Sequence, residues 1–277
     1  MSANKTFITI NFLLLKVKIK EIYCKSVLSK SGIYGVDYAL NPYTGCQHGC
    51  IYCYAIFMRR FTNRKEKWGE FVDIKINAPT ILSKEIKKFQ KGSILISSVT
   101  DAYQPLERKY EITRKCLNVL SKYDFPVTFL TKSDLILRDL DLIEQMNSKV
   151  GFTFTTIDEN IRKIFEPRAS SIEKRLDALE NIENKYIFFG PILPLFSDTE
   201  EKIREAFIKF EEKNVKRLYI DKMNLYPNVW KRMKEFLDRK TVTEYQKIKN
   251  SEEYPILLKK RISDILKDFN FEYKIGW

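Results

Sequence analysis

The stretch NPYTGCQHGCIYCYA, residues 41–55, places three cysteines, Cys46, Cys50 and Cys53, within eight residues. Their spacing is C-x3-C-x2-C. A structural zinc site usually has four ligands, often in paired C-x2-C knuckles, so three thiols are one short of a closed site. An iron–sulfur cluster is held by cysteine thiolates, and three of them on a four-iron cluster leave one iron open. The spacing therefore indicates a cluster with a free position for a substrate or cofactor.

The three cysteines are expected to lie in a loop. Gly45 and Gly49 favour a loop over a helix here, just after a candidate strand. The only histidine, His48, lies between the first two cysteines, and we expect it to be a loop residue that points away from the thiols. Cys24 and Cys116 are distant in sequence and form no second knuckle.

Composition limits the class of protein. The 277 residues are 44% hydrophobic and 31% charged, which is typical of a globular chain and long enough for one α/β barrel. The net charge of +13 favours anionic partners, with nucleic acid first, although lysine-rich chains are also typical of some thermophilic proteomes. Five cysteines, three of them clustered, do not resemble a secreted disulfide framework, so we expect a cytoplasmic protein.

The N-terminal run FITINFLLL, residues 7–15, is too short to span a bilayer. No small-residue cleavage site follows it, and a lysine-alternating stretch comes next, so we expect a strand or an N-terminal arm and no membrane partner. The densest basic run, from Arg59 to Lys67, follows the cysteines closely. Such a run is usually a solvated face, but its position makes it a candidate neighbour of a substrate, together with Tyr103 and Gln104.

Beyond residue 40, short apolar runs alternate with longer amphipathic stretches. This alternation predicts parallel strands joined by helices, with functional residues at the carboxyl ends of the strands. The spacing alone fits both an open doubly wound sheet and a partial barrel. The six predicted strands are residues 39–45, 93–99, 126–131, 149–156, 185–193 and 215–221.

Several helix starts can be placed. Pro79 marks the first helix, and Ser170 and Asp198 are the expected caps of two later ones. The tail carries one helix, residues 252–269, and one strand, residues 271–275, and we expect it to cap the main domain. The predicted divisions are an N-terminal arm (1–38), the main α/β domain (39–240) and the C-terminal cap (241–277).

The motif C-x3-C-x-aromatic-C, with Tyr52 as the aromatic residue, resembles the cluster motif of the radical S-adenosylmethionine (SAM) superfamily. The wider stretch KSGIYGVDYALNPYTGCQHGCIYCYA resembles the spore photoproduct lyase and DNA-photolyase-like branch. The resemblance continues through SSVTDAYQPLERKYEITRKCL and GFTFTTIDENIRKIFEPRASSIEKRL, and it covers roughly residues 30–221. It implies a partial (β/α)6 barrel of the TIM type with a small C-terminal cap.

The resemblance also implies a site. The three cysteines would hold a [4Fe-4S] cluster whose open iron binds SAM, and Lys132 would pair with the SAM carboxylate. Tyr52 would lie near the adenine, and Arg168 would serve the carboxylate, a substrate phosphate or a structural pairing. The remaining positions match contacts to the SAM amino acid and ribose (Thr100, Asp101), the ribose (Thr153, Thr155) and the adenine (Gly190, Pro191, Ile192).

The implied activity is reductive cleavage of SAM to a 5′-deoxyadenosyl radical that abstracts hydrogen from a substrate. An external electron donor of the ferredoxin or flavodoxin type would reduce the cluster, and the open iron would make the protein oxygen-sensitive. A nucleic-acid base is the first candidate substrate, and it would have to leave a duplex to react.

One departure and three alternatives remain. Spore photoproduct lyases carry a cysteine as hydrogen donor two residues before the position of Thr100, where this chain has Ser98, whose O–H bond is too strong for that role. Cys116 lies within a predicted helix, where packing is the better interpretation. The alternatives are a radical SAM enzyme acting on a peptide or small molecule, an iron–sulfur scaffold or electron carrier, and a zinc-binding nucleic-acid module.

Overall fold

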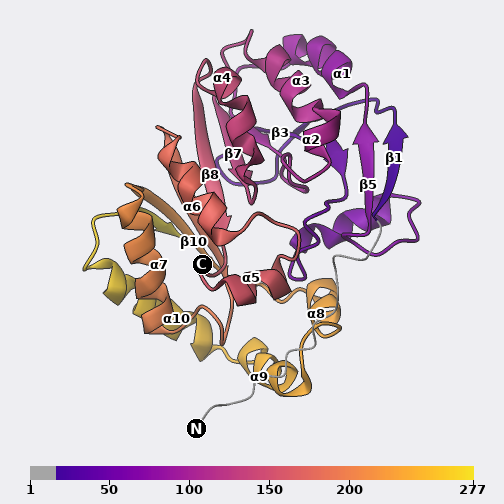
Figure 1. Ribbon diagram of the computed structural model, residues 1–277. Helices are drawn as coiled ribbons and strands as arrows, with labels where there is room; N and C mark the ends of the chain where they lie inside the picture. Colours follow the sequence, from indigo (N-terminus) through magenta and orange to yellow (C-terminus); the bar gives the residue numbers. More distant parts are fainter. Residues whose placement is uncertain (1–16) are drawn as a thin grey trace.

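An eight-stranded sheet runs through the computed structural model, which describes residues 17–277 (Figure 1). Its strands are hydrogen-bonded in the order β11-β10-β9-β8-β7-β6-β3-β2. Six of them, β3 and β6 to β10, are parallel and adjacent in chain order. Their bounds are β3 Tyr38–Leu40, β6 Ile94–Ile96, β7 Val127–Thr131, β8 Ser148–Phe154, β9 Lys185–Ile192 and β10 Arg217–Lys222.

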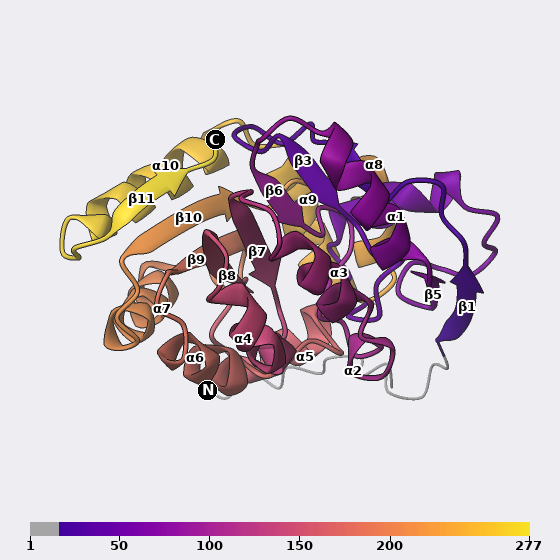
Figure 2. The same cartoon turned by 90° about the horizontal axis from the view of Figure 1, so that it is seen from above.

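The strand order decides between the two architectures that the spacing left open. A doubly wound sheet reverses direction at a switch point, whereas these six strands follow one another without a reversal. Within the described residues the edge strands β2 (Leu28–Lys30) and β11 (Glu272–Ile275) do not pair with each other, so the sheet does not close. Figure 2 shows it curving as an open wall with helices on its outer side. The predicted partial barrel is confirmed.

The first predicted strand, residues 39–45, is wrong as a single element. It divides into β3 and the two-residue β4 (Tyr43–Thr44), which belong to different sheets. Pro42 lies at the break; it has no N–H to donate to a ladder, and its carbonyl accepts from Lys75 N at 3.2 Å. β4 joins β1 (Lys18–Ile22) and β5 (Phe71–Lys75) in a three-stranded sheet that the sequence reading missed.

Helices α3, α4, α6 and α7 cover the outer face of the large sheet (Figure 2), whereas the buried hydrophobic residues of α5, α8 and α9 belong to a separate cluster that contains Cys50. Two predicted caps are wrong by one residue: Ser171 caps α6, and Thr199 caps α7. Ser170 and Asp198 are engaged elsewhere, since Asp198 accepts from Leu195 N and the Tyr254 hydroxyl. The helices are α1 Ala78–Glu85, α2 Glu107–Tyr110, α3 Ile112–Leu120, α4 Leu140–Ile143, α5 Glu159–Phe165, α6 Ile172–Glu180, α7 Glu200–Glu212, α8 Pro227–Met233, α9 Arg239–Lys249 and α10 Glu253–Leu266, with 3-10 helices Tyr54–Phe61, Ile86–Lys88 and Asp134–Asp139.

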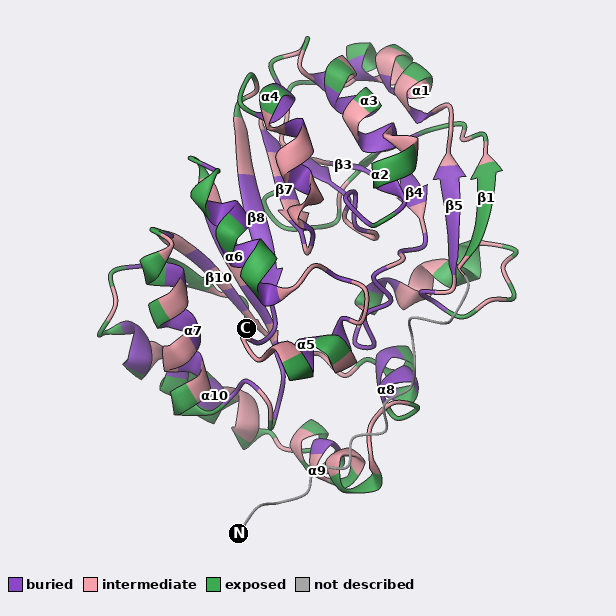
Figure 3. Cartoon of the chain, in the orientation of Figure 1, coloured by how far each residue is buried: buried purple, intermediate pink, exposed green. Residues whose placement is uncertain are grey.

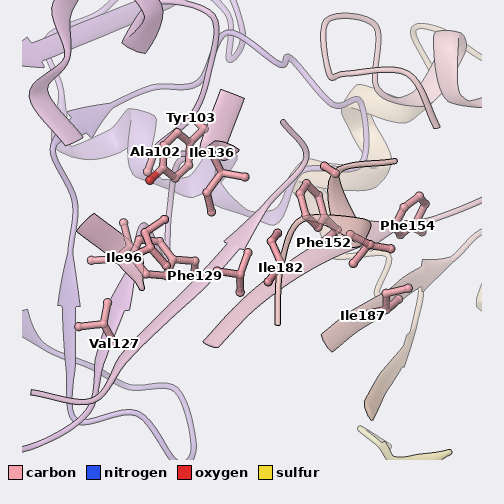
Figure 4. Close-up of a cluster of buried hydrophobic side chains, with 14 of the residues drawn as sticks. Ile96, Ala102, Tyr103, Val127, Phe129, Ile136, Phe152, Phe154, Ile182 and Ile187 are labelled. Atoms are coloured by element: carbon pink, nitrogen blue, oxygen red, sulfur yellow. The ribbon is translucent and has the colours of Figure 1, made fainter. Parts of the chain in front are cut away.

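The main core lies between the sheet and helices α1, α3, α4, α6, α7 and α10 (Figure 3). Ile96, Phe129, Phe152 and Ile187, from four neighbouring strands, are almost fully buried there (Figure 4). Strands buried on both faces read as continuous apolar runs, which is why the sequence located β7, β8 and β9 to within two residues.

The tail joins the main sheet. β11 pairs with β10 in parallel, and Leu258 and Ile262 of α10 belong to the main core. The predicted domain divisions remain predictions. FITINFLLL, for which we expect a strand or an N-terminal arm, lies outside the described residues, and the lysine-alternating stretch after it forms β1. Within the described part of the chain, no helix is both long and apolar enough to cross a membrane.

Candidate active site

The cysteine loop, residues 45–53, follows β4 and has no helical segment. Gly45 and Gly49 have φ values of +89° and +65°. A Cβ at Gly45 would lie 2.4 Å from the Phe71 carbonyl oxygen, so only glycine fits there. The loop is also anchored from outside, because Ile51 N donates to the Phe165 carbonyl at 3.0 Å. The predicted loop conformation is confirmed, and its shape is imposed by close backbone contacts.

Two cysteines of this loop, Cys46 and Cys50, are buried, and Cys53 is half-buried. Burial raises the pKa of Cys46 to about 12, and it also raises the pKa values of Cys50 and Cys53. Each of these pKa values responds to the charge of at least one neighbouring cysteine or cation, including Lys132. Deprotonating three such thiols needs a bound cation, which is the condition that iron supplies.

His48 lies in the loop, as expected, and its imidazole pairs with Asp101. Its side chain is buried, and Nδ1 lies 3.3 Å from Oδ2 of Asp101. Asp101 also accepts hydrogen bonds from the Thr131 hydroxyl at 2.7 Å and from the N–H groups of Lys132 and Tyr103, both at 2.9 Å. Burial alone raises the pKa of Asp101, but His48 and these donors outweigh it and hold that pKa below its usual value. Asp101 therefore fastens the cysteine loop to the end of β7.

Two buried N–H groups beside the cysteines have no oxygen or nitrogen acceptor among the described residues. They are Nε1 of Trp68 and Nε of Arg232. Burial raises the pKa of Cys53, and the Trp68 indole and the positive charge of Arg232 partly offset that rise. Buried donors normally find partners, so these two point to an anionic group at the thiols. The site therefore fits a thiolate-bound cluster, whose sulfur atoms accept hydrogen bonds.

Lys132 and Tyr52, two of the predicted SAM contacts, lie next to each other. The ammonium of Lys132 is 5.9 Å from the centre of the Tyr52 ring. Burial opposes the charged form of Lys132, but Cys50, Glu166 and Asp101 outweigh it and raise its pKa. The lysine therefore remains positively charged beside the cysteine loop.

The sequence reading missed Glu166, which organises this side of the site. The Tyr52 hydroxyl donates to its carboxylate, Arg175 pairs with it at 2.7 Å, and the Thr155 hydroxyl lies at 3.4 Å. Burial alone would raise the pKa of Glu166, but Arg175, Lys132 and the Tyr52 hydroxyl outweigh it. The net pKa lies below its usual value, so the carboxylate stays ionised. The carbonyl of Thr153 accepts from Arg175 at 2.7 Å. Only its place two residues before Arg168, in the family-like stretch, could have singled out Glu166.

Arg168 and Thr100 hold the backbone around the cysteines. Arg168 donates to the carbonyls of Gln47 and Gly69, and Thr100 donates to the Gly45 carbonyl at 2.6 Å. These contacts give both residues a structural role, whatever ligand they meet in addition. Pro191 and Ile192 end β9, and the Ile192 side chain lies in the main core; the backbone contact to the adenine expected for them and Gly190 stays a prediction.

The role expected for Tyr103, Gln104 and the basic run as neighbours of a substrate stays a prediction. Tyr103 and Gln104 are buried, and the Gln104 carbonyl oxygen accepts from Gln47 N at 2.8 Å, behind the cysteine loop. In the basic run, Arg64 pairs with Asp73, and Lys67 pairs with Glu235 at 2.9 Å. Much of the run is thus paired on the surface.

The other two cysteines lie apart from the site. Cys116 is buried within the main core on α3, and Cys24 donates to the Asn77 side chain at 3.3 Å. The packing role expected for Cys116 is confirmed. Ser98 is half-buried, and its hydroxyl accepts from Asn41 at 3.2 Å. Among the described residues, no three His, Cys, Asp or Glu side chains converge as ligands of one metal ion would. Thiols that each bind a different iron of a cluster need not converge in that way.

A family model described as the radical SAM superfamily matches residues 40–210. The chain belongs to this superfamily. Radical SAM proteins use a [4Fe-4S] cluster and SAM, and the residues around the cysteine loop fit both. Cys46, Cys50 and Cys53 carry the superfamily's cysteine spacing.

Similar proteins extend this finding. An uncharacterised protein of Methanocaldococcus jannaschii is 36% identical over 91% of this chain and 95% of its own length. Spore photoproduct lyase of Clostridium acetobutylicum is 27% identical over 65% of this chain and 54% of that protein. A solved spore photoproduct lyase variant with bound SAM and dinucleoside spore photoproduct superposes with a TM-score of 0.69, at 14% identity, over 94% of this chain and 82% of that one. The last likeness shows a shared fold.

Proposed function

We propose that this protein is a radical SAM enzyme that removes a hydrogen atom from a nucleic-acid base. The observation that carries the proposal is the cysteine loop itself, with two buried cysteines and a half-buried third, two N–H donors without an oxygen or nitrogen acceptor among the described residues, and the charged Lys132 at one place. When bound and reduced by an external donor, the cluster and SAM supply a 5′-deoxyadenosyl radical, which takes the hydrogen atom.

The chain's own residues would bind SAM, orient it and enclose it. Lys132 is positioned to hold the SAM carboxylate, because it is charged and lies against the cysteine loop. The ring of Tyr52 is fixed by its hydrogen bond to Glu166, and Arg175 fixes Glu166 in turn. Such a chain of buried contacts sets the position of a bound cofactor and excludes water around it.

Two features support a nucleic-acid substrate. The net charge of +13 favours a polyanion, and the similarity to spore photoproduct lyase includes a structure with a dinucleoside photoproduct bound. Ser98 stands where the lyases carry their hydrogen-donating cysteine, and neither Cys116 nor Cys24 lies at the site. We therefore propose a reaction on a base that differs from spore photoproduct repair in its final hydrogen transfer.

Cluster content and substrate response test the proposal. We expect anaerobic reconstitution to give about four irons per chain in the wild type and in Cys116→Ala, but far fewer in Cys50→Ala. Adding SAM should change the electron paramagnetic resonance spectrum of the reduced cluster. Adding oligonucleotides of mixed sequence should raise the rate of SAM consumption. A stimulation by peptides or small metabolites, with none by nucleic acid, would overturn the substrate assignment alone.

A further inference from the structure

A pocket lined by lysines lies on the outer side of α8. It has a volume of about 700 Å³, it opens between α8, the end of α9 and the loop after β10, and no carboxylate lines it. Trp230 forms part of its wall, and the ring of Tyr226 at its edge is 58% exposed. We call it the lysine pocket, after Lys231, Lys234 and Lys249.

The charges of the lysine pocket are not neutralised by the described part of the chain. Lys231, Lys234 and Lys249 are exposed, and none forms an ion pair there, whereas Lys247 on the same helix as Lys249 pairs with Glu244. Glu235, the neighbour of Lys234, pairs with Lys67 instead. Three unneutralised ammonium groups around an aromatic wall form a site for an anion with an apolar part.

Helix α8 contacts both the lysine pocket and the cysteine loop. On the inner side of α8, Arg232 donates to the Gly49 carbonyl at 3.2 Å, and Trp230 belongs to the same buried cluster as Cys50. The cysteine loop is also held by Phe165, the last residue of α5, whose carbonyl accepts from Ile51 N. A ligand in the pocket is thus about one helix diameter, roughly 10 Å, from the loop.

We propose that the lysine pocket binds the phosphate backbone of a single-stranded nucleic-acid segment next to the base that reacts. This inference rests on the proposed function and names where its substrate is held. The volume exceeds what a lone phosphate needs, and the exposed Tyr226 ring offers a face on which an unstacked base can lie. An enzyme that takes a base out of a strand must hold the flanking nucleotides while it does so.

The test is the salt dependence of binding. The probe is a fluorescein-labelled oligothymidylate of about 12 nucleotides, titrated anaerobically with the reconstituted protein and followed by fluorescence anisotropy. Neutralising the pocket with K231Q, K234Q and K249Q together should reduce the slope of log K against log salt by about 2, at about 0.7 per lost phosphate contact. At 0.1 M salt the affinity should fall about a hundredfold.

A matched variant separates the pocket from overall charge. K84Q, K87Q and K88Q remove the same charge from exposed lysines of α1 and the adjoining 3-10 helix, far from α8 in Figure 1, and should leave the slope unchanged. Y226L should keep the slope but weaken binding about tenfold, and it covers the case in which the triple variant misfolds.

Three results would overturn the inference. The first is that the wild-type protein does not bind the oligothymidylate, and the second is that both triple variants lose the same affinity for it. The third is that polyglutamate displaces the oligothymidylate as well as unlabelled oligonucleotide does, which would indicate an acidic protein partner instead. Cleavage of SAM with dithionite as reductant needs no nucleic acid in the pocket. If the pocket variant still cleaves SAM but binds the oligothymidylate as the wild type does, this inference fails while the proposed function stands.

Discussion

Trp68 directs a buried indole N–H toward the Cys53 thiol, and that N–H has no oxygen or nitrogen acceptor among the described residues. A hydrogen bond to a cluster sulfur stabilises the more negative, reduced state, so its loss lowers the reduction potential. We predict that Trp68→Phe lowers the potential of the reconstituted cluster by roughly 50 mV, a little under the 59 mV that corresponds to a tenfold change for one electron.

The potential is measured by a redox titration followed by electron paramagnetic resonance. Trp277→Phe is the control, because that indole donates to the Pro255 carbonyl at the other end of the chain. An unchanged potential in Trp68→Phe would show that the Trp68 N–H does not meet the cluster.

Lys132 gives a second prediction. Lys132→Met should keep the cluster, because it removes no thiol, but should weaken SAM binding about 10- to 100-fold, as expected for a lost hydrogen bond between charged groups. Equilibrium dialysis with labelled SAM measures the effect. Lys163→Met, at an exposed lysine of α5, should bind SAM normally. Equal affinity in the two variants would remove Lys132 from the SAM site.

At the residue scale the sequence identified the residues expected to contact the cluster and SAM, but it did not identify the residues that hold them in place. The cysteine spacing, Lys132 and Tyr52 could be named because the family-like pattern contains them. His48, Glu166 and Arg232 could not, since their roles come from contacts across 53 residues or more of chain. Thr100 and Asp101 were named for a cofactor, yet their hydrogen bonds show that they also fasten the loop.

At the scale of elements, α6 is joined to the site by a buried ion pair. Arg175 and Glu166 are both almost fully buried and lie 2.7 Å apart. Removing one partner of such a pair leaves an uncompensated charge and costs about 3 to 5 kcal/mol. We predict that Arg175→Met lowers the apparent melting temperature by roughly 10 °C in differential scanning calorimetry.

Arg204→Met on α7 is the comparison for that prediction. Its ion pairs with Glu200 and Asp268 are exposed, and such pairs contribute at most about 1 kcal/mol. A similar melting temperature for both variants would contradict the stabilising role assigned to the buried pair.

Strands were easier to predict than helix ends. The buried parallel strands are continuous apolar runs, whereas adjacent polar residues compete to cap a helix. Ser170 and Ser171 are equally good caps in sequence, and the choice of Ser171 depends on Ser170 bonding to the 3-10 helix before α4. The small sheet was missed because β4 has two residues and gives no periodic signal.

For the whole molecule, the tail is part of the structural framework. Ile262 is buried in the main core, and Tyr245 is buried in the cluster that contains Cys50. We predict that deleting residues 241–277 gives a chain that aggregates or fails to melt cooperatively, because it exposes the β10 edge and both clusters. Light scattering and calorimetry of the purified chain measure this outcome. A truncated chain that melts like the full one would make the tail dispensable.

The central claim is radical chemistry at the cysteine loop, and the most direct test is the formation of 5′-deoxyadenosine. The reconstituted protein is given dithionite and SAM under anaerobic conditions, and the product is identified by mass. The account predicts 5′-deoxyadenosine from the wild type and from Cys116→Ala, and none from Cys50→Ala. A wild-type protein that carries a full cluster but neither binds SAM nor forms 5′-deoxyadenosine, with or without nucleic acid, would contradict it.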